Sequence, residues 1–367
     1  MKLIQLDWKN FLKKHLMWKF LALACCSMLL SVGYFKLFQE GKIYYELDQA
    51  INQVRELEAE LKYSEALTDE RSDFISRYRS TYNRQRGIYQ VDKNISSLPA
   101  AIDERIVLRE QADELLGYLA DEYLESIDGI QKDKTIIQYL SDHELLISDY
   151  ASNNIVVQNI VVLLGLGGGL FIYALLSSEL LVSHQLKQTL LEAIPEKLFI
   201  RHMSYYGYTV VVYFMLPILA ILLVLLGYSL AVNSHVWQHP YLISQGDSYI
   251  ALANWQIIAW SLLMTLVATA LAYQFLFIVT PILQDSIFSA LIFIALVSLP
   301  IFFTSAWVNY LPYSHSILYP VFHQQSGSLV IDITKQLGIS IGYVLILQLI
   351  IWVIHKLRVT KRLLFKL

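Results

Sequence analysis

Charge is scarce in this chain. Of its 367 residues only 16% are Asp, Glu, Lys or Arg, whereas 56% are hydrophobic. A soluble domain carries about 25% charged residues, so the composition argues against an ordinary soluble protein and for a chain that resides in a bilayer. Cysteine is scarce too. Cys25 and Cys26 are adjacent inside an apolar stretch, which excludes a disulfide framework and predicts that both pack as small apolar groups.

The sequence also lacks a phosphate-binding glycine loop of the Walker type. Without that loop the chain does not hydrolyse nucleotide alone, so we expect no cofactor in this chain and no enzyme activity of its own. The glycine-rich run at 165–169 lies among Leu, Val and Phe, which favours close helix packing over a nucleotide loop. No Ser/His/Asp set or pair of carboxylates stands out for catalysis.

Six apolar stretches are long enough, or nearly so, to cross a bilayer as helices. They predict an all-α membrane protein with six transmembrane helices. The fifth stretch is short and ends near Pro300, so we expect it to be broken or tilted. The interiors of the stretches carry no Asp, Glu, Lys or Arg, which argues against an ion-coupled carrier. The stretches cover 16–38, 155–177, 205–230, 255–279, 287–303 and 337–354.

Positive charge gives the orientation of these helices. Lys and Arg gather before the first stretch, between the second and third, and after the last, whereas the intervening loops at 231–254 and 304–336 carry almost none. Because Lys and Arg in short loops stay on the cytoplasmic side, both termini are expected in the cytoplasm of a bacterial inner membrane. A segment at 1–15 is expected to be an amphipathic interfacial helix.

The segment from residue 39 to 153 differs from the rest and is predicted to be an extracytoplasmic helical domain. Between 40 and 152 lie 24 acidic and 13 basic side chains, so this part is strongly acidic while the remainder is basic. We expect mostly helix and no sheet. The domain is either a solvated stalk without a binding role, or a docking surface or lid.

Apolar periodicity predicts a coiled-coil-like hairpin inside this domain. Leu47, Ile51, Val54 and Leu61 recur at helical spacing, and a second such stretch covers 102–119. The segment from 96 to 99, which contains a proline, is the expected turn between the two helices.

Four histidines are candidates for a metal site. In the predicted topology they share the outer face, and four imidazoles can hold a soft or borderline metal. Trp and Tyr lie among them, and this mixture is also typical of a membrane headgroup belt, which is the favoured interpretation. The residues are His235, His239, His315 and His323.

The cytoplasmic loop at 178–204, inside the predicted membrane part 154–367, has amphipathic helical character and is large enough to dock on another protein. We expect it to be either a coupling helix or a surface helix at the headgroups. It contains a Glu, then a Thr, a Leu-rich turn, a Pro and basic residues. In order these are Glu179, Gln188, Thr189, Leu191, Glu192, Pro195, Glu196, Lys197 and Arg201.

This arrangement, together with the amphipathic start and the six stretches, resembles the membrane subunits of type 2 ABC exporters. Gln188 replaces the glycine usual in that family, and the spacing from Glu179 to Thr189 is longer. The resemblance implies that the loop residues couple the chain to cytoplasmic ABC ATPase subunits, which bind ATP and Mg. It also implies a dimer with a second permease copy or a paralogue.

The sequence thus predicts a permease subunit that exports or extracts a hydrophobic or amphiphilic substrate. The competing function is a membrane scaffold or sensor whose acidic domain binds an envelope protein, and a membrane-embedded enzyme is a third, less supported class. Membrane lipids are expected partners, and nucleic acid is not.

Overall fold

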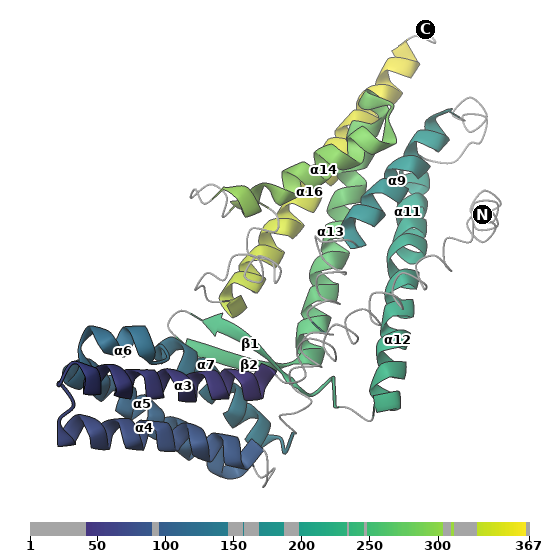
Figure 1. The fold of residues 1–367 in the computed structure, drawn as a ribbon. Coiled ribbons are helices and arrows are strands. Elements are labelled where there is room, and N and C mark those ends of the chain that lie inside the picture. The colour runs from purple at the N-terminus through teal and green to yellow at the C-terminus, as the bar shows by residue number, and fades with distance from the viewer. Residues whose placement is uncertain are drawn as a thin grey trace. The chain divides into compact units, whose positions relative to one another are not determined.

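The computed structural model describes residues 42–89, 95–145, 157, 169–186, 198–232, 235–245, 248–303, 310–311 and 329–364. These residues are mostly helical, as the sequence predicts (Figure 1). The chain divides into two compact units. We call residues 1–27, 158–230 and 257–367 the membrane body, and residues 28–157 and 231–256 the charged domain.

Three helices are long and apolar enough to cross a membrane, which indicates a membrane protein. They cover His202–Leu230, Asn254–Leu283 (α13) and Leu337–Ile354, the last within α16 (Leu329–Leu364). They coincide with the third, fourth and sixth predicted stretches.

The other three predicted spans are not confirmed. The second corresponds in its described part to α9 (Gly169–Leu186), whose apolar portion is the short Ile172–Val182. The fifth is α14 (Ser286–Phe302), also short, and it begins where Asp285 accepts a hydrogen bond from the Phe288 amide at 2.8 Å. The first stretch, the interfacial segment before it and the glycine run up to residue 168 lie outside the described residues. Helices α9 and α14 pack against each other.

The first long span contains a change of helix type. It consists of α11 (Leu198–Thr209), a π-helical segment labelled η3 (Val210–Met215) and α12 (Leu216–Val232). The amide of Leu216 donates to the Val211 carbonyl, five residues back. Pro217 follows at once, and its ring would crowd the carbonyl four residues before it in a regular helix. The wider π turn lies just before that proline.

The charged domain is a packed group of helices. It contains α3 (Lys42–Tyr63), α4 (Asp69–Gly87), the 3-10 turn η2 (Ile95–Ser97), α5 (Leu98–Leu116), α6 (Tyr118–Tyr123) and α7 (Ile127–Asp142). Helix α4 packs against both α3 and α5 (Figure 1). The predicted coiled-coil-like hairpin is not confirmed: η2 lies at the expected turn before α5, but α4 lies between α3 and α5 in the chain and packs against both.

Local sequence signals set the ends of these helices. Thr68 caps α4 by accepting a hydrogen bond from the Arg71 amide, and Ser126 caps α7 through the Gly129 amide. Gly117 ends α5 with φ of +59° and ψ of −135°, a conformation that a side chain disfavours. These caps explain why the chain turns where it does.

The helices of the charged domain enclose one apolar core. Its most deeply buried apolar side chains come from α3, α4, α5 and α7, at the helical spacing that sequence periodicity predicts. They include Leu57, Ile75, Leu98, Ile102, Leu108 and Ile130.

Two strands also belong to the charged domain. β1 (Pro240–Gln245) and β2 (Ser248–Ala253) form an antiparallel hairpin whose register runs from Pro240 opposite Ala253 to Gln245 opposite Ser248. Both strands pack against α7. This corrects the prediction of an all-α chain and of a domain without sheet: the segment expected as a loop between spans supplies a strand pair to the domain.

Candidate functional site

Uncharged polar side chains connect four helices of the membrane body. We call this set the polar layer. It comes from α9, α11, α13 and α16. Its members are Tyr173, His202, Tyr206, Thr209, Tyr273, Gln274 and Gln348.

Tyr173 and Thr209 join α9 to α11. Their hydroxyl oxygens are 3.0 Å apart, and both side chains are fully buried. The Thr209 hydroxyl donates to the Tyr206 carbonyl at 2.9 Å, so the Tyr173 hydroxyl donates the hydrogen bond that connects the helices. Each hydroxyl thus has a partner, which offsets the cost of removing it from water.

An aromatic group joins α11 to α13. The His202 ring lies 5.3 Å from the Tyr273 ring and 4.4 Å from the Phe277 ring, the latter edge to face. Tyr206, one turn further along α11, lies 5.3 Å from the Tyr273 ring. Tyr273 also donates to the His202 carbonyl at 3.4 Å. An imidazole is therefore held among aromatic rings inside the bundle.

Two amides join α13 to α16. The side-chain amide of Gln274 donates to the side-chain oxygen of Gln348 at 3.0 Å. Gln274 is buried, and Gln348 is half-buried. An amide pair of this kind gives a contact between two helices a defined register.

Part of the polar layer is left unsatisfied. Nδ1 of His202 and the side-chain oxygen of Gln274 have no hydrogen-bond partner among the described residues, although both are buried. Buried polar atoms without a partner cost roughly 1 to 3 kcal/mol each. Apolar residues would pack there more stably, so the polar layer is the candidate functional site of the membrane body.

The π-helical segment η3 directly follows Thr209. π segments are rare and lie frequently at functional sites. Here the segment separates the polar part of the span, from His202 to Thr209, from its apolar part in α12. The polar layer thus ends at a place where the helix changes its hydrogen-bond pattern.

Of the predicted ATPase-coupling residues, the structure describes Glu179 and Arg201. Glu179 is exposed on α9, one residue after Ser178, whose hydroxyl donates to the Ser286 carbonyl at 2.8 Å and so joins α9 to α14. Arg201 belongs to the first turn of α11. Gln188, Thr189, Leu191, Glu192, Pro195, Glu196 and Lys197 lie outside the described residues.

The predicted histidine site receives no support from the described residues. His235 is exposed and His239 is fully buried, with Nδ1 of His239 2.8 Å from the His235 carbonyl oxygen. No group of three or more possible metal ligands occurs in the described part of the chain. His315 and His323 lie outside it.

Sequence reasoning missed the polar layer because it looked for charged side chains at depth. The available signal was spacing: His202, Tyr206 and Thr209 are four and three residues apart, so they lie on one helical face. Tyr273 and Phe277 repeat this spacing on α13.

A second buried polar cluster lies in the charged domain around Arg105, which is fully buried in α5. Its guanidinium is 3.3 Å from a Glu125 carboxylate oxygen, lies 4.1 Å from the Tyr82 ring centroid and donates to the side-chain oxygen of Gln85. Tyr82 donates to Glu125 at 3.2 Å. Burial lowers the pKa of Arg105, but the surrounding tyrosines and carboxylates raise it above its usual value, so the charge is retained. Burial raises the pKa of Tyr78, one turn from Tyr82, to about 12.

Arg109 extends this cluster by one turn of α5. It forms ion pairs with Asp113 at 2.6 Å and Asp121 at 2.5 Å, and it donates to the Glu125 carbonyl at 3.0 Å. Arg105 and Arg109 both occupy positions of the buried face of α5. The core of this domain is therefore built around two arginines as well as around aliphatic groups.

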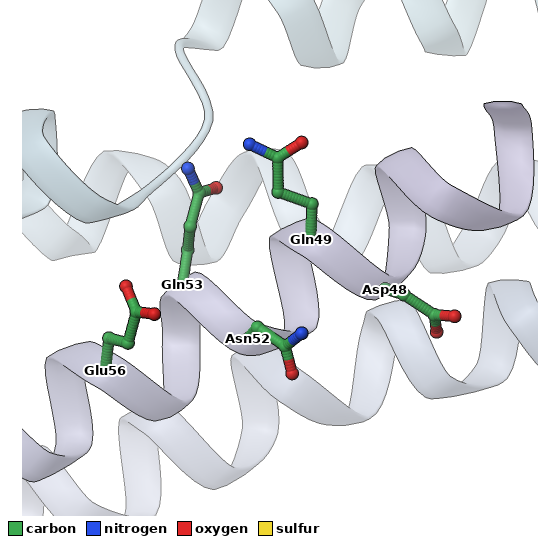
Figure 2. Close-up of a pocket in the computed structure, with 5 residues that line it drawn as sticks. All are labelled: Asp48, Gln49, Asn52, Gln53 and Glu56. Atoms are coloured by element: carbon green, nitrogen blue, oxygen red, sulfur yellow. The ribbon is translucent and has the colours of Figure 1, made fainter.

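A shallow groove lies on α3 of the charged domain. Its side chains come from one face of that helix, at spacings of one, three and four residues, and all are polar or acidic (Figure 2). Asp48 also pairs with Arg86 of α4 at 2.9 Å. The groove is lined by Asp48, Gln49, Asn52, Gln53 and Glu56.

Comparison with known proteins identifies no relative. A scan against protein-family models, a search of curated proteins and a search of solved structures each found no match. The function is therefore argued from the residues and their geometry.

Proposed function

We propose that the chain is the permease subunit of an ABC transporter in a bacterial inner membrane, working as a dimer with separate ATPase subunits. The observation that carries the proposal is the polar layer, in which buried uncharged groups join α9, α11, α13 and α16. Helices that only anchor a domain need no such groups, and polar residues inside a bilayer are costly to keep. The arrangement favours a substrate path over a plain anchor.

The position of the predicted coupling loop supports an external source of energy. The loop joins α9 to α11, and both helices contribute to the polar layer. His202 lies four residues after the start of α11, which is about one helical turn. A partner protein that moves this loop therefore also moves the polar layer, because about one helical turn of α11 joins the two.

The chemistry of the layer favours a hydrophobic or amphiphilic substrate. Its side chains offer hydroxyl, amide and imidazole groups among aromatic rings, without any Asp, Glu, Lys or Arg. Such a surface accepts an apolar body and a hydrogen-bonding group, whereas a charged ion finds no counter-charge.

Purification of the full chain in mild detergent tests the proposal, followed by identification of bound chains and an ATPase assay. We expect an ABC ATPase to co-purify. In vesicles, Gln274→Leu is expected to lower transport while the ATPase still co-purifies. Thr265→Val is the matched control, since its buried hydroxyl donates within α13, to the Ser261 carbonyl at 2.7 Å. Retention of function in cells without any ABC ATPase would overturn the proposal.

A scaffold or sensor is the second candidate, favoured by the separate core and the acidic α3 groove of the charged domain. It predicts that the same purification captures an envelope protein and no ATPase. In that case substitutions in the groove, such as Asp48→Asn with Glu56→Gln, weaken capture, and Gln274→Leu does not.

A further inference from the structure

Two atoms of the polar layer offer hydrogen bonds that the protein does not use. They are Nδ1 of His202 and the side-chain oxygen of Gln274, and neither has a partner among the described residues. His202 is 4% exposed and Gln274 is 8% exposed. Because a buried polar atom without a partner is unfavourable, both atoms favour a bound group that forms hydrogen bonds with them.

The chemistry of the two atoms selects the kind of group. The side-chain nitrogen of Gln274 already donates to the Gln348 oxygen at 3.0 Å, which leaves the Gln274 oxygen, an atom that can only accept. Nδ1 of a neutral His202 donates or accepts, according to the tautomer. A hydroxyl group both donates and accepts, so it suits both atoms. A carbonyl or ether oxygen has no proton to donate to Gln274.

Tyr273 places both residues at one level of the bundle. Its ring lies 5.3 Å from the His202 ring, and its hydroxyl donates to the His202 carbonyl at 3.4 Å. Gln274 is the next residue of α13. Since successive residues of a helix differ by only about 1.5 Å along its axis, His202 and Gln274 can contact different parts of one small headgroup.

The amide pair of the layer borders an apolar surface. Gln348 is half-buried, and Leu345 and Trp352 of the same helix are exposed. They are three residues before and four residues after Gln348, so all three side chains lie on one face of α16. An apolar chain can therefore lie along this face while the polar group attached to it reaches Gln274.

The absence of charge in the layer limits the headgroup further. The buried side chains in the described part of the membrane body include no Asp, Glu, Lys or Arg. A phosphate or ammonium group would lose its hydration there without gaining a counter-charge. An uncharged hydroxyl loses less and gains the two hydrogen bonds that His202 and Gln274 offer.

We propose that His202 and Gln274 bind the uncharged, hydroxyl-bearing headgroup of an amphiphile whose apolar chain lies along the exposed face of α16, an inference that rests on the permease function proposed above.

Competition between two probe lipids in nanodiscs tests the proposal. The full chain is reconstituted in phosphatidylcholine, whose headgroup donates no hydrogen bond, with equal amounts of monooleoylglycerol and its dimethyl ether. The ether keeps the chain and the oxygen atoms but has no O–H group. Native mass spectrometry then measures which probe the protein retains. We expect the alcohol to be retained at least about fivefold over the ether, since the ether leaves buried acceptors unpaired.

An anionic probe tests the requirement for an uncharged headgroup. Oleyl phosphate carries a similar apolar chain, and we expect it to be retained no better than the ether because the layer holds no counter-charge. Retention of oleyl phosphate as strong as that of the alcohol would overturn this requirement and with it the proposal.

Substitutions at the two residues locate the site. Gln274→Leu removes the accepting oxygen and His202→Phe keeps a ring without its nitrogen, so each is expected to lower the preference for the alcohol toward one. His202→Asn is expected to retain the preference, because asparagine has a hydrogen-bonding atom at the same number of bonds from Cα as Nδ1. Thr265→Val is the control and is expected to behave as the wild type, since its hydroxyl donates within α13.

Equal retention of the alcohol and the ether would overturn the proposal, as would a preference that Gln274→Leu and His202→Phe leave unchanged. The nanodiscs contain no ATPase, so this result is independent of the transporter proposal. Preference for the alcohol without a co-purifying ATPase would contradict the transporter and retain the binding site. A co-purifying ATPase without the preference would do the reverse.

Discussion

The two units of this chain bury polar groups in opposite ways. The charged domain places Arg105 at 0% exposure and compensates it with Glu125, Gln85 and an aromatic ring. In the described part of the membrane body the buried polar side chains include no Asp, Glu, Lys or Arg. Water solvates the partly exposed carboxylates that pair with the buried arginines of the charged domain. Lipid does not solvate charge, so the buried polar groups of the membrane body are uncharged and hydrogen-bonded.

The exposure of apolar side chains also differs between the two units. Leu57 and Leu61 of α3 are 0% and 1% exposed, whereas Leu345 and Leu349 of α16 are 65% and 63% exposed. In water such surfaces drive association, but in a bilayer they face lipid at no cost. An exposed leucine is therefore a surface for association in the charged domain but a lipid contact in the membrane body.

Removing the buried arginine is the largest expected effect. Arg105→Ala leaves Glu125 and Gln85 without their partner and is expected to destabilise the charged domain by about 3 to 5 kcal/mol. Chemical denaturation of the full chain, followed by exchange of α5 peptides, measures it. Arg84→Ala is the control, since the Arg84 to Glu104 pair is exposed and contributes about 0 to 1 kcal/mol. Equal effects of both variants would contradict the comparison of buried with exposed charge.

The next effect concerns the backbone at the end of α5. Gly117→Ala places a side chain at φ of +59° and ψ of −135° and is expected to cost about 1 to 3 kcal/mol in the same denaturation measurement. Gly87→Ala is the paired control, because Gly87 lies in α4 and a Cβ added there meets open space. That substitution is expected to be neutral or to stabilise by a few tenths of a kcal/mol. If Gly87→Ala destabilised the domain and Gly117→Ala did not, the positive φ of Gly117 would not explain the cost of substituting these glycines.

The amide pair of the membrane body is expected to contribute less. A double-mutant cycle of Gln274→Leu and Gln348→Leu should give a coupling energy of about 0.6 kcal/mol, up to roughly 1.7 kcal/mol, because hydrogen bonds between membrane helices are modest. Unfolding of the chain in detergent or bicelles measures it. A coupling energy of zero would mean that the two amides do not interact in the folded protein.

The smallest effect is expected at an exposed pair. The side-chain bond from Lys62, with a smaller contribution from Arg79, holds the pKa of Glu58 below its usual value. A lowered pKa means stabilisation at neutral pH that is lost as pH falls through the acid range. Glu58→Gln should therefore cost a few tenths of a kcal/mol at pH 7 and nothing near pH 2. A cost that is the same at both pH values would point to packing instead of charge.

The sequence predicted some of these elements correctly and missed others for identifiable reasons. Long apolar runs without charge located the three long spans, and the repeat from Leu47 to Leu61 located α3. Helix α4 was missed because its buried face is made of Tyr78, Tyr82 and Gln85 as much as of aliphatic residues, so apolar periodicity is weak there. The hairpin was missed because Tyr241 and Ile243 were assigned to a loop between spans.

The candidate site was less predictable than the fold. The amphipathic loop was recognised, yet His202 and Gln274 were passed over because neither is charged. Their significance lies in contacts between residues more than 70 positions apart, such as Gln274 with Gln348. Spacing within one helix gives the face of a residue but not the helix that faces it.

By itself, the sequence determined that this is a helical chain with apolar spans and a separate acidic segment, because transfer of side chains from water depends on composition and periodicity. Only the tertiary structure decided that residues 231–256 join the acidic segment, that Arg105 and Glu125 pair inside it, and that four helices share a polar layer. These facts depend on which surfaces bury each other, and burial is a property of pairs of distant segments.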